Sequence, residues 1–168
     1  FCISDLDRAV PFKPGVFDKM VSICVLQHLK RPDRFLKAVH QSLRPGGVLA
    51  LTVDSLPYGD GAEALLEDHR RICQIQEYYD VTKIVDLLHS NGFRVQHGSY
   101  VAKSKISRLF YRQLMWLYLR SEQKGEILPL CFFKCLALPM FALSTLCDSF
   151  CDDDWVGYRL VVSASRIE

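Results

Sequence analysis

The sequence has no strong excess of charge of either sign. Its 21 Lys and Arg residues nearly balance its 19 Asp and Glu residues, which leaves a formal net charge of +2 over 168 residues. A nucleic-acid-binding surface needs a basic stripe to neutralise phosphates, so the composition predicts no nucleic-acid partner. Internal repeats and low-complexity tracts are also absent. With 49% hydrophobic residues, the chain is expected to form one globular domain over residues 1–168.

The seven cysteines lack the CxxC spacing that is typical of metal knuckles. Their number is odd, and Cys24, Cys131 and Cys135 stand in apolar runs, where a reduced cysteine behaves as a small hydrophobe. Cys147 and Cys151 repeat the four-residue spacing of Cys131 and Cys135, which would place each pair on one helix face. Zinc would require both pairs to converge, so the prediction is a reducing compartment and no metal site.

Targeting and membrane-spanning segments are not evident. No basic n-region or cleavage site follows Phe1, so no secretory signal is expected and a cytoplasmic location is predicted. The apolar run over residues 127–147 is interrupted by Pro129, Lys134 and Pro139. The uninterrupted apolar lengths are too short to cross a bilayer.

The first third of the chain predicts a strand, a helix and a second strand. Residues 2–4 read as the end of a strand, and residues 17–25 are apolar almost throughout, as in a strand that is covered on both faces. Helical spacing follows from Arg31 to Leu43, and Pro45-Gly46-Gly47 is expected to end that helix before a strand over 48–53. This order implies a right-handed parallel crossover.

The rest of the chain predicts two more helices, two more strands and an insert. The helices are expected around 62–69 and from Asp80, which can cap the helix, to the Asn91-Gly92 stop. The strands are expected over 93–101 and 157–164. Between them lies a helical insert over 103–152, which begins with a basic amphipathic helix that carries Lys105, Arg108 and Arg112. The insert is expected either to cap the substrate pocket or to contact a membrane surface through residues 103–147.

Several short motifs occur in an order that resembles one enzyme family. They are Asp5, Pro11-Phe12, Phe17-Asp18, Leu26-Gln27-His28-Leu29, Leu43-Arg44-Pro45-Gly46-Gly47 and Asn91-Gly92-Phe93. This set resembles the central part of class I S-adenosylmethionine-dependent methyltransferases of the type 11 kind.

The resemblance implies a Rossmann-like α/β fold, with a doubly wound, mostly parallel sheet, a final antiparallel strand and ligands at the carboxyl ends of the strands. The predicted strands would be the third to the seventh of that sheet. The first strand with its GxGxG loop and the second strand with its acidic residue have no counterpart in the sequence. The chain is therefore expected to be an N-terminally truncated fragment with a partial sheet.

The resemblance also implies S-adenosylmethionine as cofactor and assigns residues to it. Asp5 would accept a hydrogen bond from the adenine amino group, and Leu6 would stack beside the ring. Val25, Gln27 and His28 would contact the cofactor at the end of the fourth strand, and His28 is a candidate base. The alternatives are that Asp5 is a turn residue and that His28 is a hydrogen-bonded structural histidine.

The acceptor side is expected just after the fifth strand, where Asp54, Ser55 and Tyr58 would form its rim. His69 is the second candidate base, because relatives often carry a histidine shortly before the helix that ends in Gly-Phe. The alternative for His69 is a solvated helix face, since its neighbours are charged.

The predicted function is methyl transfer from S-adenosylmethionine to a small or lipid- or sugar-linked acceptor, as an O-methyltransferase located in the cytoplasm or at the cytoplasmic membrane face. Binding of a lipid-linked saccharide would follow from the loose similarity of the insert to caps in cell-envelope methyltransferases. The alternative is a non-catalytic interaction module or truncated pseudoenzyme. A nucleotide-dependent oxidoreductase is disfavoured because no dinucleotide glycine fingerprint is present.

Overall fold

The computed structural model describes residues 3–55, 63–124, 142–151 and 157–167. The chain divides into two compact units, which are described separately. Unit 1 comprises Phe1–Asp54, Gln76–Ser99 and Leu160–Glu168, and unit 2 comprises Ser55–Ile75 and Tyr100–Arg159.

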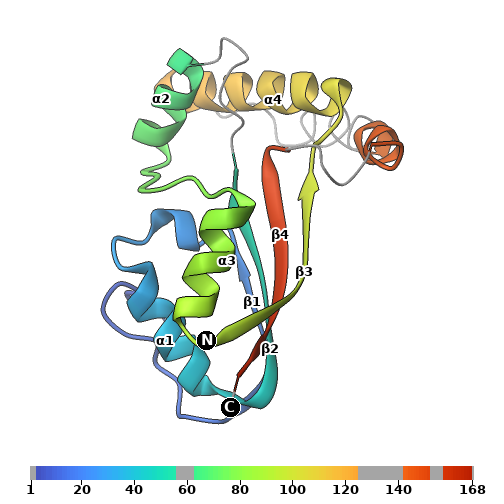
Figure 1. The fold of residues 1–168 in the computed structure, drawn as a ribbon. Helices are drawn as coiled ribbons and strands as arrows, with labels where there is room; N and C mark the ends of the chain where they lie inside the picture. The colour runs from blue at the N-terminus through green and yellow to red at the C-terminus, as the bar shows by residue number, and fades with distance from the viewer. Residues whose placement is uncertain (1–2, 56–62, 125–141, 152–156, 168) are drawn as a thin grey trace. The chain divides into compact units, whose positions relative to one another are not determined.

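A four-stranded sheet has the order β1-β2-β4-β3. Its strands are β1 (Phe17–Ile23), β2 (Leu43–Asp54), β3 (Phe93–Val101) and β4 (Arg159–Arg166). β1 and β2 are parallel, which confirms the predicted parallel pairing. Figure 1 shows that β4 runs opposite to its neighbours, as expected for the last strand. Residues 3 and 4 are not in a strand, so the predicted strand end at residues 2–4 is wrong in its described part.

The crossover helix is α1 (Pro32–Ser42), and its inner face is built from the residues that the helical spacing indicated. Phe35, Leu36 and Val39 are at most 6% exposed. Pro32 stands in the first turn, where its missing N–H group removes no intrahelical hydrogen bond. The helix therefore begins and ends close to the predicted positions because one apolar stripe faces the sheet.

The start of β2 differs from the prediction, because Pro45-Gly46-Gly47 lies inside the strand. β2 begins at Leu43, which pairs with Phe17, and Val48 pairs with Lys19. Between these two pairs, one residue of β1 (Asp18) lies opposite four residues of β2 (44–47). Gly46 has a φ of 72° in this irregular stretch. A positive φ of this size favours glycine, so the motif forms a bulge rather than a boundary.

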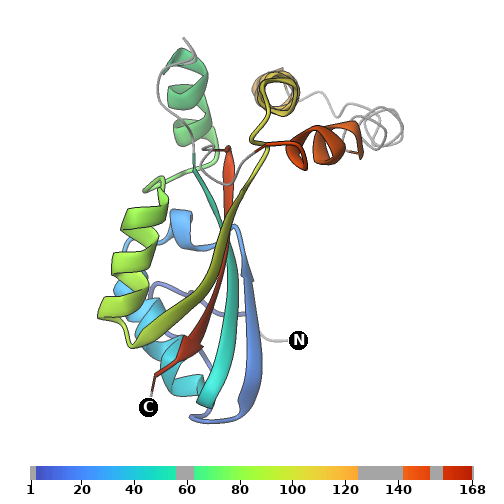
Figure 2. The same ribbon diagram turned by 45° about the vertical axis from the view of Figure 1, so that its right-hand side comes forward.

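Helix α3 (Val81–Ser90) follows the prediction at both ends. The Asp80 carboxylate accepts a hydrogen bond from the backbone N–H of Lys83 at 2.7 Å, and Gly92 has a φ of 83°. Ile84 and Leu88 are fully buried. In Figure 2, α1 and α3 lie on the same face of the sheet, and the Asn91 amide donates to Asp33 of α1 at 3.2 Å.

The two faces of the sheet are covered unequally at β1. Ser22 pairs with Leu51 and both are buried, at 7% and 2% exposed, whereas Val21 and Ile23 are 70% and 66% exposed. Alternation puts Val21 and Ile23 on the face opposite to Ser22. A doubly wound sheet has helices on both faces, so the described part of unit 1 is the partial sheet that the sequence predicted.

Unit 2 contains α2 (Glu63–Ile72), α4 (Lys105–Lys124) and a helix over 142–148. α2 packs against α4. The Asp148 carboxylate joins the third helix to the start of α4, because it accepts hydrogen bonds from the backbone N–H of Lys103 and Ser104 and from the Ser107 hydroxyl. The whole range of the predicted insert, 103–152, falls within this unit. Among the residues described, no helix has the length and apolar character required to cross a membrane.

Candidate functional site

The carboxyl ends of β1 and β2 bring Gln27 and Asp54 into contact. Gln27 lies in the short 3₁₀ helix η1 (Leu26–His28), which follows β1, and Asp54 is the last residue of β2. Both side chains are buried, and Gln27 Nε2 donates to Asp54 Oδ2 at 3.1 Å. One predicted cofactor contact and one predicted acceptor contact are therefore neighbours at the edge of the sheet where parallel strands place ligands.

The Gln27 amide has one unused acceptor. Because a carboxylate can only accept, the amide nitrogen must face Asp54 and the carbonyl oxygen must point elsewhere. That Oε1 atom is buried and has no hydrogen-bond partner within the described chain. The backbone of Gln27 is fully used, since its carbonyl oxygen accepts from Gln76 and Glu77. A buried acceptor without a partner costs about 1–3 kcal/mol, which a bound N–H or O–H donor would recover.

Asp5 and His28 are both exposed. The Asp5 carboxylate accepts from the backbone N–H of Asp7 at 3.1 Å and pairs with Arg8 at 3.2 Å. In turn, Asp7 Oδ1 accepts from the backbone N–H groups of Lys30 and Arg31 at 2.9 and 3.1 Å. Asp7 thus ties the Asp5 loop to the segment directly after η1. This role of Asp7 was not predicted from the sequence, although the sequence shows a second aspartate two residues after Asp5.

The remaining predicted cofactor contacts are Val25 and Leu6. Val25 is half-buried directly before η1, and the backbone N–H of His28 donates to its carbonyl oxygen. Leu6 lines a pocket of about 300 Å³ beside α1, together with the basic residues Arg8, Arg34 and Lys37. Neither Asp5 nor His28 lines that pocket.

His69 lies on α2 in unit 2, at the wall of a largely apolar pocket of about 250 Å³. The other walls come from α4 and are Tyr111, Leu114, Met115 and Tyr118. His69 is half-buried, so its ring does not lie on a fully solvated face.

Two further acceptor residues were predicted after β2. Ser55 is 4% exposed, and its backbone N–H donates to the Tyr158 carbonyl oxygen at 2.9 Å, which fixes the chain directly after Asp54. Tyr58 lies outside the described residues.

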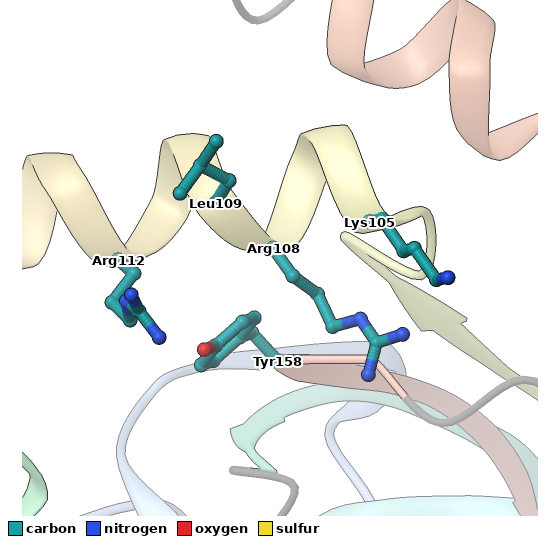
Figure 3. A pocket seen from close by; sticks show the side chains of 5 residues that line it. All are labelled: Lys105, Arg108, Leu109, Arg112 and Tyr158. Atoms are coloured by element: carbon teal, nitrogen blue, oxygen red, sulfur yellow. The ribbon is translucent and has the colours of Figure 1, made fainter. Parts of the chain in front are cut away.

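A second pocket of unit 2 is strongly basic (Figure 3). It has a volume of about 230 Å³ and is lined by Lys105, Arg108, Leu109, Arg112 and Tyr158. Figure 3 shows the guanidinium groups of Arg108 and Arg112 directed from α4 toward Tyr158, while Leu109 points away. The helical spacing of Lys105, Arg108 and Arg112 was recognised in the sequence. Their position opposite Tyr158 was not predicted, because Tyr158 follows Arg112 by 46 positions in the chain.

Tyr79 and Lys83 have the four-residue spacing of tyrosine-dependent oxidoreductases, but their surroundings do not fit that chemistry. Burial, reinforced by the charges of Glu77 and Asp33, raises the pKa of Tyr79 to about 12. A tyrosine that acts as an acid needs a lowered pKa. Lys83 is paired with Glu77 at 2.8 Å.

Metal ligands do not cluster in the described parts of the chain, where no group of three or more His, Cys, Asp or Glu residues could hold an ion. Cys147 and Cys151 are free thiols. Cys131 and Cys135 lie outside the described residues.

Comparison with known proteins supports a methyltransferase fold. Residues 1–51 match the family described as "Methyltransferase domain". No curated protein sequence matches the chain. Among solved structures, the [4+2]-cyclase SpnF is 17% identical with a TM-score of 0.59, and the match covers 99% of this chain and 55% of SpnF.

Two further structures belong to methyltransferases. One is phosphoethanolamine N-methyltransferase 2 of Haemonchus contortus in complex with S-adenosyl-L-methionine, which is 18% identical with a TM-score of 0.60. The match covers 98% of this chain and 36% of the Haemonchus enzyme. A S-adenosylmethionine-dependent methyltransferase of Mesorhizobium loti is 17% identical with a TM-score of 0.56, with coverage of 97% and 68%. The chain thus spans about half of SpnF and about a third of the Haemonchus enzyme. Residues 1–51 thus match a methyltransferase-domain family, and the chain has a fold similar to that of these S-adenosylmethionine-dependent methyltransferases.

Proposed function

We propose that the chain is the later part of a methyltransferase that transfers the methyl group of S-adenosylmethionine to a hydroxyl of a small or lipid- or sugar-linked acceptor. The observation that carries this proposal is the Gln27–Asp54 contact at the carboxyl edge of the sheet, with the unpartnered Gln27 Oε1 beside it. The match of residues 1–51 to a methyltransferase domain covers Gln27 and the loop of Asp5.

The residues of unit 1 fit a cofactor with amino groups. The Asp5 carboxylate is exposed and can accept from the adenine amino group, with Leu6 beside the ring. Val25, Gln27 and His28 follow β1, and Gln27 Oε1 offers a buried acceptor. The bound cofactor would supply a methyl group that is already activated by its positive sulfur. The protein would then need to align the acceptor, exclude water and remove one proton.

His69 is proposed as the group that accepts the hydroxyl proton. His69 is half-buried and shares the wall of its pocket with Tyr111 and Met115. An imidazole can accept a proton near neutral pH. His28 is the second candidate and is exposed to solvent on η1. His69→Gln should lower the rate of methyl transfer by about 10²–10⁴-fold without weakening cofactor binding, and His28→Gln is the matched comparison.

The uncovered sheet face supports the proposal that additional chain supplies the glycine-rich loop. Val21 and Ile23 are largely exposed on β1, which is an edge strand of the described sheet. The same observation supports the alternative function, a non-catalytic interaction module that uses this face. SpnF is described as a cyclase, so this fold does not by itself specify methyl transfer.

Calorimetric titration separates the two functions. We expect S-adenosylmethionine to bind tightly to the chain when it is extended by the protein encoded directly upstream, and weakly or not at all to residues 1–168 alone. Asp5→Ala in the extended protein should weaken binding by about 1.5–3 kcal/mol, the value of a hydrogen bond to a charged group. No cofactor binding by the extended protein would leave the interaction module as the function.

A further inference from the structure

We propose that one face of helix α4 docks unit 2 on the surface of a membrane that contains anionic phospholipids. This face consists of Ile106, Leu109, Gln113, Trp116 and Arg120, all of which are exposed. We refer to these five residues as the outer row. The proposal concerns residues of unit 2 only, and it requires neither cofactor binding nor methyl transfer.

The outer row is an apolar stripe on a helix that is already buried on another side. Its residues follow one another at alternating spacings of three and four, which places them on one face. Ile106, Leu109 and Trp116 are 52%, 56% and 45% exposed, whereas Met115 and Leu119 are 7% and 3% exposed. Figure 3 shows Leu109 pointing away from the pocket that the neighbouring turns of α4 line. Exposed apolar side chains that share one face, next to polar residues, are typical of a surface that binds a partner.

Positive charge flanks the outer row. No Asp or Glu occurs from Lys105 to Arg120. Lys105 is exposed and stands four residues before Leu109, so the two side chains are neighbours on the helix surface. Neither Lys105 nor Arg120 takes part in the ion pairs of the described residues. Both charges are therefore available to anionic headgroups, which attract Lys and Arg near the membrane surface.

Trp116 and Arg120 form a pair that suits the headgroup layer. The Arg120 guanidinium lies over the Trp116 ring, 4.9 Å from its centroid. Indole rings favour the interface of a bilayer, because their apolar body can be buried while the N–H group stays hydrated. An arginine side chain can likewise bury its carbon chain and keep its charged group among the phosphates. This end of the outer row therefore matches a surface that is partly apolar and partly anionic.

The helix over 142–148 adds exposed apolar side chains to unit 2. Leu143, Leu146 and the following Phe150 are 46%, 57% and 82% exposed. This helix is attached to the start of α4, because Asp148 Oδ1 accepts a hydrogen bond from the Ser107 hydroxyl at 2.6 Å. Two attached helices thus carry apolar side chains that unit 2 leaves uncovered. The strength of an interfacial contact grows with the apolar area that it buries.

Charge favours a lipid surface over a second copy of the chain. Outer rows that met in antiparallel orientation would bring Lys105 of each copy toward Arg120 of the other, and parallel rows would bring identical residues together. Both arrangements place like charges next to each other, which opposes association. An anionic membrane surface instead complements the positive charge at both ends of the row.

Cosedimentation of the 168-residue chain with vesicles tests the proposal. The vesicles consist of phosphatidylcholine alone or of phosphatidylcholine mixed with phosphatidylglycerol, and no cofactor is added. We expect binding to the mixed vesicles that weakens in high salt, because salt screens the attraction of the headgroups. Leu109→Gln should weaken this binding about tenfold through lost apolar burial, and Lys105→Gln about fivefold through lost charge. No binding of the unchanged chain to the mixed vesicles would overturn the proposal.

Two matched control variants lie in unit 1. Val21→Gln removes an apolar side chain that is 70% exposed from β1, and Lys37→Gln removes an exposed charge from α1. Both should leave vesicle binding unchanged. Circular dichroism checks that every variant is folded. Weakening by the two control variants equal to that by Leu109→Gln and Lys105→Gln would contradict a contact through α4.

The fluorescence of Trp116 locates the contact. The chain contains two tryptophans, and Trp155→Phe leaves Trp116 as the only one. Its emission should shift to shorter wavelength when mixed vesicles are added, because the indole leaves water. An unchanged emission while the chain cosediments would show that another surface binds the vesicles, and the proposal would be wrong.

Sedimentation equilibrium without lipid tests the second copy as the occupant. A dimer that Leu109→Gln dissociates would assign the outer row to self-association and overturn the membrane contact. A monomer that binds the mixed vesicles through Trp116 supports the proposal. If the extended protein then transferred no methyl group, the proposed function would fail while the membrane contact remained.

Discussion

Gln27 Nε2 lies 3.1 Å from Asp54 Oδ2, at the carboxyl ends of two adjacent parallel strands. Neither side chain is more than 8% exposed. The contact joins residues 27 positions apart in the sequence and fixes the chain on both sides of the predicted site.

The change Gln27→Glu tests how far the site depends on this contact. It replaces the donor by a second buried carboxylate next to Asp54, and two like charges at this distance cannot both ionise without cost. We expect the free energy of unfolding at neutral pH to fall by about 1–3 kcal/mol, and part of the loss to be recovered in mild acid, where one proton is shared. Urea unfolding measures this. The double variant Gln27→Glu, Asp54→Asn supplies a donor again and should regain stability, while an unchanged stability of Gln27→Glu would contradict the expectation.

Asp148 should make unit 2 sensitive to acid. Burial by itself would raise the pKa of Asp148, but the hydrogen bonds from Ser107, Ser104 and Lys103 outweigh it and hold the pKa below its ordinary value of 3.8. The ionised form therefore stabilises the fold above that value, and this contribution is lost as the pH falls through the lower folded-state pKa.

Asp148→Asn should remove that acid-dependent loss. It should also cost about 1–3 kcal/mol at neutral pH, because an amide NH₂ would face the donors that the carboxylate accepts from. Asp68→Asn is the control, since Asp68 forms an exposed pair with Arg71 and should change stability little. The pH dependence of urea unfolding distinguishes the variants, and identical acid profiles of Asp148→Asn and the unchanged chain would refute the role of Asp148.

Tyr79 should make unit 1 sensitive to alkali. Its pKa is raised from 10.0 to about 12 by burial and by Glu77 and Asp33, so the folded state retains the proton longer than the unfolded chain. The resulting stability is complete below the unfolded pKa and declines as the pH rises from 10.0 toward 12. Tyr79→Phe cannot ionise and should lose less stability over this interval. The unfolding midpoints in urea at both ends of the interval provide the measurement, and parallel declines would show that other groups are responsible.

Gly92→Ala should destabilise the end of α3. Gly92 has a φ of 83°, and a Cβ atom there would lie 2.8 Å from His40 Nε2. The positive φ costs about 1–2 kcal/mol for a residue with a Cβ, and the close approach to the imidazole adds to it. Adding His40→Ala should relieve the contact but not the backbone cost. A melting temperature of Gly92→Ala equal to that of the unchanged chain would show that this turn adapts.

The elements that the sequence predicted well are those whose signal is local. The stripe of Phe35, Leu36 and Val39 sets α1, and Asp80 with Gly92 sets the two ends of α3. The strand over 93–101 has the predicted bounds. The start of β2 was predicted wrongly at Val48, because Pro45-Gly46-Gly47 forms a bulge inside the strand. Whether such a segment forms a bulge depends on its register with β1, which lies far away in the sequence.

By itself the sequence determined the order of strands and helices, the family that residues 1–51 resemble, and the residues that end each parallel strand, because periodicity and turn residues act over a few positions. The tertiary structure alone decided which of those residues meet. In unit 1, Gln27 contacts Asp54, and Asp7 binds the segment after η1 to the loop of Asp5. In unit 2, His69 and Tyr111 line one pocket, and Tyr158 and the arginines of α4 line another. These contacts join positions far apart in the chain, and their geometry depends on packing that no short stretch of sequence encodes.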